Sequence, residues 1–165
     1  TAIVDSSVKK GLLYPILKEE VNYINSLVLA EKRDIKFNSI KKEEKYQSYS
    51  NVVRIEIEDE KGGKFSIVGI IGANNEERII EINDYPLDVV LSENMMLIQN
   101  NDVPGVIGNV GRILGEENIN IATMHVGRKK DSAIMLLTVD GIVEEKSIKK
   151  LEESEQIRWV KYLNL

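Results

Sequence analysis

The sequence predicts an α+β protein, because two different hydrophobic periods occupy separate segments of the chain. Apolar residues recur at spacings of three and four between residues 6 and 33, which is the period of one helical face. From residue 53 the spacing changes to two, which is the period of a half-buried strand. Beyond residue 94, segments of both kinds follow one another in the order βαββαβ.

A long helix is predicted over residues 6–33. The residues expected on its buried face are Leu13, Ile16, Leu17, Val21, Ile24 and Val28. Ser6 or Ser7 is the expected N-cap, because a serine oxygen accepts a hydrogen bond from an unpaired N–H group of the first turn. Pro15 is expected to kink or restart the helix, since its ring clashes with the preceding turn.

A β-hairpin is predicted after this helix. Residues 53–58 and 65–71 both alternate between apolar and polar side chains, and the run Lys61-Gly62-Gly63-Lys64 between them is a turn signal. One more strand is predicted over residues 79–82. Residues 84–93 contain a proline and end in polar side chains, so we expect them to form a short connection.

The second half of the chain predicts the split βαβ plan, which is also called ferredoxin-like. The sheet is expected to be antiparallel with both helices on one face, so that its other face needs a cover or faces water. We therefore expect an α+β domain over residues 1–90 and a βαββαβ domain over residues 91–165. The elements expected in the second domain lie, in order, at residues 95–99, 103–117, 119–126, 133–139, 144–153 and 157–163.

The composition argues against several classes of function. The 165 residues carry a formal charge of −5, whereas a domain that binds duplex nucleic acid normally has a basic face. The sequence has no cysteine and one histidine, His125, so we expect no disulfide and no metal site, and a cytoplasmic protein. No apolar run approaches the roughly 20 residues of a membrane span. Nucleic acid and membranes are therefore not expected partners.

Three glycines at a spacing of three, Gly105, Gly108 and Gly111, follow the first strand of the second domain. A dinucleotide-binding loop needs the pattern G-x-G-x-x-G, with an acidic residue about twenty positions later. This stretch reads G-x-x-G-x-x-G, and Gly127-Arg128 stands where the acidic residue is expected. No nucleotide cofactor is therefore expected in this chain. Gly108 and Gly111 are instead expected to let the sheet or a partner subunit approach the helix closely.

The residues just before this helix indicate an amino-acid site. Asp102 is the expected N-cap, Pro104 is tolerated in a first turn, and Gly105 removes a side chain where a ligand would approach. The unpaired N–H groups of the first turn favour an anion such as a carboxylate. The oxygens of Asn100 and Asp102 could hold an ammonium group. An ordinary capping aspartate without any ligand is the open alternative.

Motifs in both halves resemble known regulatory domains. Those of the second half resemble the ACT domain, a small βαββαβ module that binds amino acids and regulates metabolic enzymes: Asn101-Asp-Val-Pro-Gly-Val-Ile-Gly108, Ile113-Leu-Gly115, Asn118-Ile-Asn-Ile-Ala-Thr-Met124 and Gly127-Arg128. Those of the first half resemble the allosteric substrate-binding domain that precedes the ACT domain in long-form D-3-phosphoglycerate dehydrogenases: Lys10-Gly-Leu-Leu13, Val21-Asn-Tyr-Ile-Asn25, Tyr49-Ser-Asn51 and Arg78-Ile-Ile-Glu-Ile-Asn83.

The resemblance covers residues 8–165 and implies the C-terminal regulatory part of such an enzyme, with the upstream domain truncated at its N-terminus. L-Serine or another small amino acid would bind between the ACT domains of a homodimer or higher oligomer and inhibit serine synthesis by feedback. NAD would bind only in the catalytic part, so this chain alone would not turn over substrate. Arg78 is the implied candidate for an anion contact upstream. The implied effector-binding residues are Asn100, Asp102, Pro104, Gly105, Val106, Ile107 and, from the partner subunit, Asn120.

Three alternatives stay open at the level of sequence. The regulatory β part of an iron–sulfur L-serine dehydratase also joins these two kinds of domain, and it would serve serine breakdown instead of synthesis. A structural ACT dimerisation module would have the fold without a ligand. A free-standing enzyme would need an acid–base pair or a metal cluster, and the sequence shows neither.

Overall fold

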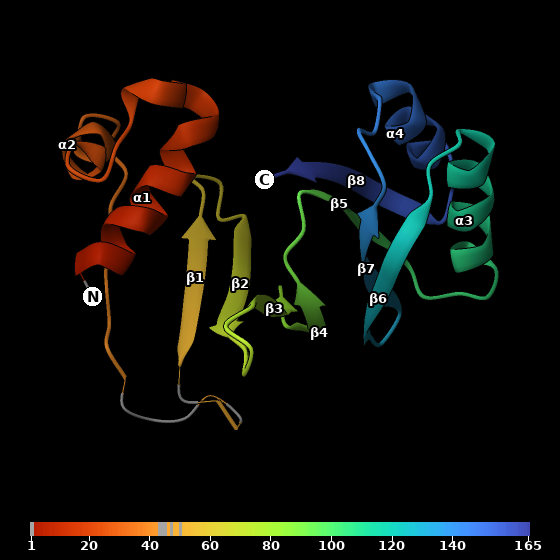
Figure 1. Cartoon of the computed structure of the whole chain (residues 1–165), viewed down its shortest axis with the longest axis horizontal. Helices are drawn as coiled ribbons and strands as arrows, with labels where there is room; N and C mark the ends of the chain where they lie inside the picture. The colour runs from red at the N-terminus through yellow and green to blue at the C-terminus, as the bar shows by residue number, and fades with distance from the viewer. Residues whose placement is uncertain (1, 43–45, 47, 50) are drawn as a thin grey trace. The chain divides into compact units, whose positions relative to one another are not determined.

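The computed structural model describes residues 2–42, 46, 48–49 and 51–165. The chain divides by its internal contacts into two compact units, Thr1–Lys45 and Tyr46–Leu165 (Figure 1). The predicted division into residues 1–90 and 91–165 would fall within the second unit, between its two sheets, and it stays a prediction.

The first unit is helical. It contains α1 (Ala2–Leu17), the 3-10 turn η1 (Lys18–Glu20) and α2 (Ser26–Glu31). Its small core is formed by Leu13, Val21 and Ala30, with Leu17, Leu29 and Ile35 packed against them. The prediction of one helix over residues 6–33 is therefore wrong.

Two asparagines explain why the helix is interrupted. The side-chain oxygen of Asn22 accepts hydrogen bonds from the backbone of Ile24 and Asn25, and the side chain of Asn25 bonds back to Asn22 and Glu20. Such local side-chain bonds compete with helical ones. The predicted single face is broken as a result, and Ile24 is 92% exposed.

The predicted N-cap serines also lie elsewhere. Ser6 and Ser7 are inside α1, which begins at Ala2, and the Ser7 hydroxyl donates to the carbonyl of Ile3, one turn earlier. The helix continues through Pro15 and ends two residues later, so the expected effect of proline is limited to the end of α1.

The second unit begins with an antiparallel sheet in the order β1-β2-β3-β4. Its strands are β1 (Val52–Glu58), β2 (Lys64–Ile71), β3 (Glu77–Ile82) and β4 (Tyr85–Val90). The predicted hairpin and third strand are confirmed. At the hairpin turn, Asp59 accepts hydrogen bonds from the backbone of Lys61 and Gly63, and Gly62 has a φ of +79°.

Strand β4 was not predicted, because residues 84–93 were expected to be a connection. Asn83 and Asp84 both have positive φ angles, 48° and 59°, and they form a two-residue turn that brings Tyr85 opposite Ile82. Pro86 is tolerated because β4 is an edge strand of its sheet. The proline that indicated a loop is therefore compatible with a strand here.

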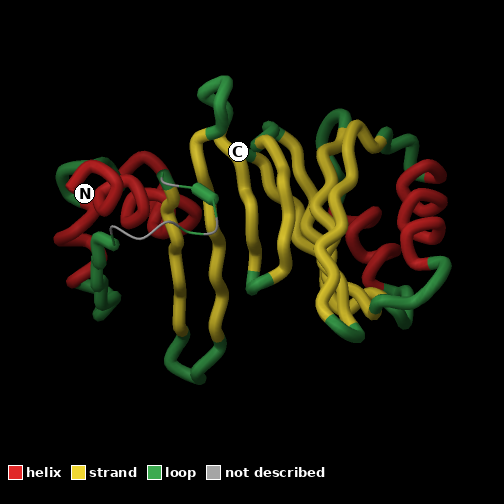
Figure 2. Tube along the Cα trace, turned by 90° about the horizontal axis from the view of Figure 1, so that it is seen from below, coloured by secondary structure: helices red, strands yellow, loops and turns green. Residues whose placement is uncertain are grey.

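The remaining elements confirm the predicted βαββαβ order. They are β5 (Asn94–Asn101), α3 (Val106–Glu116), β6 (Ile121–Lys129), β7 (Ser132–Val139), α4 (Glu145–Glu152) and β8 (Ile157–Asn164). The sheet has the order β6-β7-β5-β8, and all its pairings are antiparallel. Both helices lie on one face, as Figure 2 shows, and Met96, Ile98 and Leu137 pack there against Val110 and Leu114 of α3.

The other face of this sheet is covered by the first sheet. Met95 and Leu97 of β5 form a second core with Ile82, Tyr85 and other residues of β3 and β4. Strands β5 and β7 are therefore buried on both faces, which explains why Met95–Ile98 and Ala133–Leu137 are all 5% exposed or less.

One glycine lets the two sheets come together. Gly127 on β6 is buried, and a Cβ atom there would lie 2.6 Å from the carbonyl oxygen of Pro86 and 3.0 Å from the Cβ of Tyr85. The first obstacle is backbone and cannot rotate away. Only glycine therefore fits at this crossing of β4 and β6.

The two helices of the second sheet are joined by Glu117, which follows α3. Its carboxylate pairs with Lys150 and, at 3.7 Å, with Lys146, both on α4, and accepts a hydrogen bond from the Ser147 hydroxyl at 3.4 Å. The hydrogen bond from Lys150 is the main cause that holds the pKa of Glu117 below its ordinary value.

We expect Gly127→Val to lower the free energy of unfolding of the second unit by about 1–3 kcal/mol, because the added side chain forces β4 and β6 apart. Urea unfolding followed by circular dichroism measures this change. Gly108→Ala is the matched control. Apart from the chain neighbours and the backbone of α3, its methyl group would have no described atom within 4 Å, and we expect up to about 1 kcal/mol of stabilisation from helix propensity. Equal effects of the two variants would contradict the close crossing.

We expect the ion pairs of Glu117 to stabilise the chain near neutral pH and to be lost in acid. Its pKa is lowered in the folded state, so the stabilisation is complete above the ordinary value of 4.5 and disappears as pH falls through the lower folded-state pKa. The difference in Tm between the wild type and Glu117→Gln should therefore shrink below pH 4.5. Glu153→Gln controls for the loss of one negative charge. A difference that is constant with pH would refute this role of Glu117.

Candidate functional site

The candidate site lies where β5 ends and α3 begins. Asn100 is the next-to-last residue of β5, Asp102 follows the strand, and α3 starts at Val106 after Gly105. The chain therefore brings Asn100, Asp102 and the first turn of α3 to one end of the sheet, as the sequence predicts. We call this region the α3 mouth.

Asn100 has a buried oxygen without a partner. The residue is 3% exposed, and it lies on the helix side of β5, because Met96 and Ile98 at the same alternation pack against α3. Its Nδ2 donates to the carbonyl of Asn101 at 2.6 Å, but its Oδ1 accepts no hydrogen bond from any residue that the structure describes. Leaving a buried acceptor unpaired costs about 1–3 kcal/mol, so this oxygen is suited to receive a donor from a ligand.

Asp102 does not cap α3, so that prediction is wrong. The N-cap is Gly105, with a φ of +92° and no side-chain cap, and the Oδ2 of Asp102 instead accepts a hydrogen bond from Arg128 Nε at 2.7 Å. The left-handed turn at Gly105 displaces Asp102 from the capping position. Among the described residues, no side chain caps the N–H groups of Val106 and Ile107, and uncapped N–H groups at a helix start favour an anion.

The sheet does not pack closely against Gly108 and Gly111, which was one of the two expected reasons for these glycines. Apart from the chain neighbours and the backbone of α3, a Cβ atom at Gly105, Gly108 or Gly111 would meet no described atom within 4 Å. Gly105 is needed for its positive φ, and it leaves the α3 mouth open. The closeness of a partner subunit to Gly108 and Gly111 stays a prediction.

Asn120 lies at the opposite end of the same helix. It precedes β6, is exposed, and donates from Nδ2 to Asp140 Oδ2 at 2.7 Å. The 11 residues of α3 separate it from the α3 mouth by about 16 Å. Within one chain Asn120 does not join Asn100 and Asp102, so its predicted contact with the effector requires a second subunit.

Arg78 is already occupied by carboxylates. On β3, its guanidinium donates to Asp88 at 2.7 Å and to Glu76 at 3.2 Å. The hydrogen bond with Asp88 is the main cause that raises the pKa of Arg78. The positive charge of Arg78 is thus already balanced by two carboxylates, which makes it a weaker site for an anionic ligand.

The sequence analysis missed a set of links through the β6–β7 turn, Lys129–Ser132. On one side of the turn, the carbonyl of Asp131 accepts a hydrogen bond from the backbone N–H of Asp102 at 3.1 Å. On the other side, Lys129 Nζ lies 3.2 Å from Asp84 Oδ2, and the hydroxyls of Ser132 and Tyr85 are 2.6 Å apart. The α3 mouth is thus connected to the β3–β4 turn through a few direct contacts.

These links continue into the first sheet. Arg54 on β1 donates to Asp84 Oδ1 at 3.4 Å and to Glu81 Oε1 at 2.8 Å, while Tyr46 donates to the other oxygen of Glu81 at 2.6 Å. Lys129 and then Arg54 hold the pKa of Asp84 below its ordinary value. Arg54 is not part of any recognisable sequence motif. Its contacts with Glu81 and Asp84 therefore become evident only from the order of the strands in the sheet.

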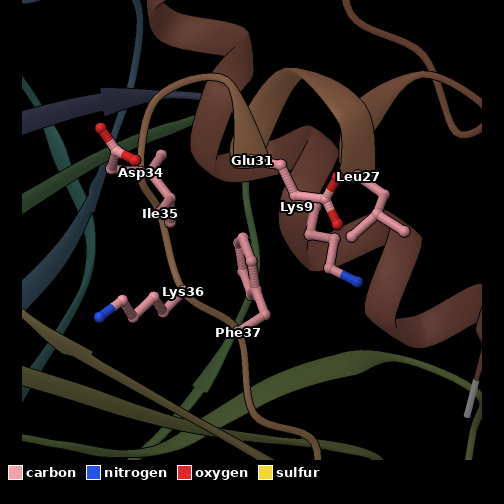
Figure 3. A pocket seen from close by; sticks show the side chains of 7 residues that line it. All are labelled: Lys9, Leu27, Glu31, Asp34, Ile35, Lys36 and Phe37. Carbon is pink, nitrogen blue, oxygen red and sulfur yellow. The ribbon is translucent and has the colours of Figure 1, made fainter.

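A separate open pocket lies in the first unit. Figure 3 shows its lining, which combines two lysines and two carboxylates with three apolar residues: Lys9, Leu27, Glu31, Asp34, Ile35, Lys36 and Phe37. The ammonium group of Lys9 is 5.1 Å from the centre of the Phe37 ring. The charges balance, so the pocket has no evident preference for an anion or a cation.

The α3 mouth does not fit a nicotinamide dinucleotide. Such cofactors bind where a parallel strand leads into a helix through G-x-G-x-x-G, whereas β5 belongs to an antiparallel sheet and the glycines are spaced by three. Within the described ranges, the structure contains no helix long and apolar enough to cross a membrane.

Two protein families match the chain. The family described as "D-3-phosphoglycerate dehydrogenase intervening domain" matches residues 1–83, and the ACT domain family matches residues 95–156. The first match covers the region from α1 to β3, and the second covers the region from β5 to α4 and ends before β8. They favour the dehydrogenase over the L-serine dehydratase alternative.

Curated relatives match the whole chain. The D-3-phosphoglycerate dehydrogenase of Methanocaldococcus jannaschii is 37% identical over 167 residues, which cover 100% of this chain and 31% of that enzyme. The Bacillus subtilis enzyme of the same name is 35% identical, again with 100% and 31% covered. The Archaeoglobus fulgidus enzyme is 33% identical, with 100% and 32% covered. The chain thus spans about a third of the length of these relatives.

Proposed function

Because this chain belongs to the D-3-phosphoglycerate dehydrogenase intervening-domain family and carries an ACT domain, we propose that it binds L-serine and mediates feedback inhibition of such a dehydrogenase. The observation that carries the proposal is the α3 mouth, where an uncapped helix start lies beside the buried, unpaired oxygen of Asn100. NAD would bind in the catalytic part of the enzyme and not in this chain. The enzyme would be located in the cytoplasm.

The α3 mouth suits both charged ends of a free amino acid. The N–H groups of Val106 and Ile107 would bind the carboxylate, because a helix N-terminus favours an anion. The Oδ1 atoms of Asn100 and Asp102 would accept hydrogen bonds from the ammonium group, since the structure gives neither atom a donor among the described residues. Pro104 and Gly105 leave the entrance free of large side chains.

The proposed mechanism needs two subunits. Asn120 of one ACT domain would complete the site of another, because it lies at the far end of its own α3. A ligand shifts an equilibrium only by its difference in affinity between two states. A bridging amino acid has such a difference, since separated or rotated subunits would lose half of its contacts.

The β6–β7 turn would carry the signal away from the site. A ligand held by Asp102 would restrain Asp131 through the backbone hydrogen bond between them. Lys129 and Ser132, in the same turn, contact Asp84 and Tyr85 in the sheet of β1 to β4. The network around Asp84 would then pass the restraint toward the catalytic part of the enzyme.

We expect millimolar L-serine to give heat in calorimetry with the wild-type chain and to raise its Tm. A ligand at 100 times its Kd stabilises a folded protein by about 2.7 kcal/mol. Asp102→Ala should abolish binding, whereas Arg78→Ala should change it little, because Arg78 is paired with Glu76 and Asp88.

The two variants separate the alternatives. Equal losses in Asp102→Ala and Arg78→Ala would move the site to the intervening domain. A wild-type chain that shows neither heat nor a shift in Tm with L-serine would overturn the effector assignment. A structural ACT module without a ligand would then be the better description.

We expect L-serine to increase protection from hydrogen exchange at residues 129–132 and also at residues 83–84. Tyr85→Phe removes the hydrogen bond to Ser132, so it should reduce the effect at residues 83–84 while keeping it at residues 129–132. The β1–β2 turn at residues 61–63 is the internal control. Protection confined to the α3 mouth would contradict the proposed path.

A further inference from the structure

Arg128 forms an ion pair with Asp102 at the α3 mouth. Arg128, at the end of β6, donates from Nε to Asp102 Oδ2, and its side chain is 72% exposed. A guanidinium carries five donor hydrogens in a fixed planar fork. Those of the two Nη atoms have no acceptor among the residues that the structure describes. The free donors are therefore presented next to the carboxylate assigned to the ligand's ammonium group.

The orientation of Arg128 follows from the strand. Gly127 and Lys129 face the first sheet, where they meet Pro86 and Asp84, so Arg128 between them lies on the helix side. Asn100 is on that same side, and its β7 neighbour Ala133 pairs with Arg128. Arg128, Asn100 and Asp102 therefore border the same end of the sheet.

We infer that Arg128 binds the carboxylate of the effector. The Arg128–Asp102 pair then binds a zwitterion and discriminates against amines that lack a carboxylate. The inference rests on the proposed amino-acid site. Asp102 alone would attract any ammonium compound. With the guanidinium beside it, the pair presents one positive and one negative group side by side, which matches the two charges that an α-amino acid carries on one carbon.

The pairing geometry leaves room for the ligand. A carboxylate offers about four lone-pair positions, and Arg128 uses one on Oδ2, so Oδ1 of Asp102 remains for the ammonium group. Exposed ion pairs contribute little net stability, so Arg128 can shift toward a ligand carboxylate at small cost to the fold. The uncapped N–H groups of α3 would bind the same carboxylate from the other side.

Arg158 is another cation at this end of the sheet, and it is a weaker candidate. Its Nε donates at 3.0 Å to the Oδ1 of Asn101, the residue before Asp102. The acceptor is an uncharged amide and not a carboxylate. Arg128 is favoured because it contacts the carboxylate itself. Its free donors therefore lie where the carboxylate of a ligand held by Asp102 would be.

Calorimetry with two probes tests the inference on the full 165-residue chain. L-Serine carries an ammonium group, a hydroxyl and a carboxylate, and ethanolamine lacks only the carboxylate. Arg128→Gln should weaken L-serine binding on the order of tenfold or more, the range of a hydrogen bond between charged groups. It should leave ethanolamine binding unchanged or make it tighter. Arg128→Lys should be intermediate, since it keeps the charge but loses the fork.

Arg112→Gln is the matched control, because Arg112 is also an exposed arginine in an ion pair, with Glu116 on α3. It should change neither probe. Equal weakening of both probes by Arg128→Gln would show that Arg128 only positions Asp102, and unchanged L-serine binding would show no role at all. Either result overturns the inference while the amino-acid site stands. If the wild-type chain does not bind L-serine, both the proposed amino-acid site and the inference about Arg128 are refuted.

A second measurement covers the case in which ethanolamine binds the wild type too weakly to detect. The side-chain nitrogen NMR signals of Arg128 should shift when L-serine is added, because its Nη groups gain an acceptor. Signals of Arg112 should stay in place. Unshifted Arg128 signals at saturating L-serine would overturn the inference.

Discussion

The structure of the second unit depends on the burial of β5 and β7 on both faces. Met96 and Ile98 face the helices, and Met95 and Leu97 face the first sheet, so the two cores share the strands β5 and β7. This arrangement requires the sheets to lie close enough for β4 to cross β6, which Gly127 permits. The ACT fold and the β3–β4 hairpin are for this reason parts of one hydrophobic assembly, and a change at one sheet is felt at the other.

The candidate site occupies the point at which this double burial ends. Asn100 still belongs to the buried part of β5, whereas Asp102 already has a half-buried side chain with an exposed arginine as its partner. Within a few residues the chain therefore places the buried Oδ1 of Asn100, the carboxylate of Asp102 and the uncapped start of α3. Hydrogen bonds to a charged ligand would gain strength in such a partly desolvated place, where the side chain of Asp102 is still 19% exposed.

Apolar sequence patterns predicted those helices and strands whose structure follows from burial. Local polar contacts explain the segments that were predicted wrongly. The apolar runs of β5 and β7 and the apolar stripe of α3 matched the observed strands and helix closely. The interruption at Asn22 and Asn25, the hairpin turn at Asn83 and Asp84, and the left-handed Gly105 all depend on hydrogen bonds or φ angles that an apolar pattern does not carry. For the candidate site, the chemistry of Asn100 and Asp102 pointed to an amino-acid ligand, and this stays a prediction. The contact between Arg128 and Asp102 was not predicted, because strand pairing and not sequence distance brings these residues together.

The turn at Asn83 and Asp84 has a consequence for stiffness. A two-residue hairpin contains no spare chain length, and Asp84 is held from one direction by Lys129 and from another by Arg54. A longer loop would absorb a small displacement of its neighbours by bending. A two-residue turn cannot bend in this way, so a displacement of Asp84 would be passed directly to β3 and β4, the two strands that it joins.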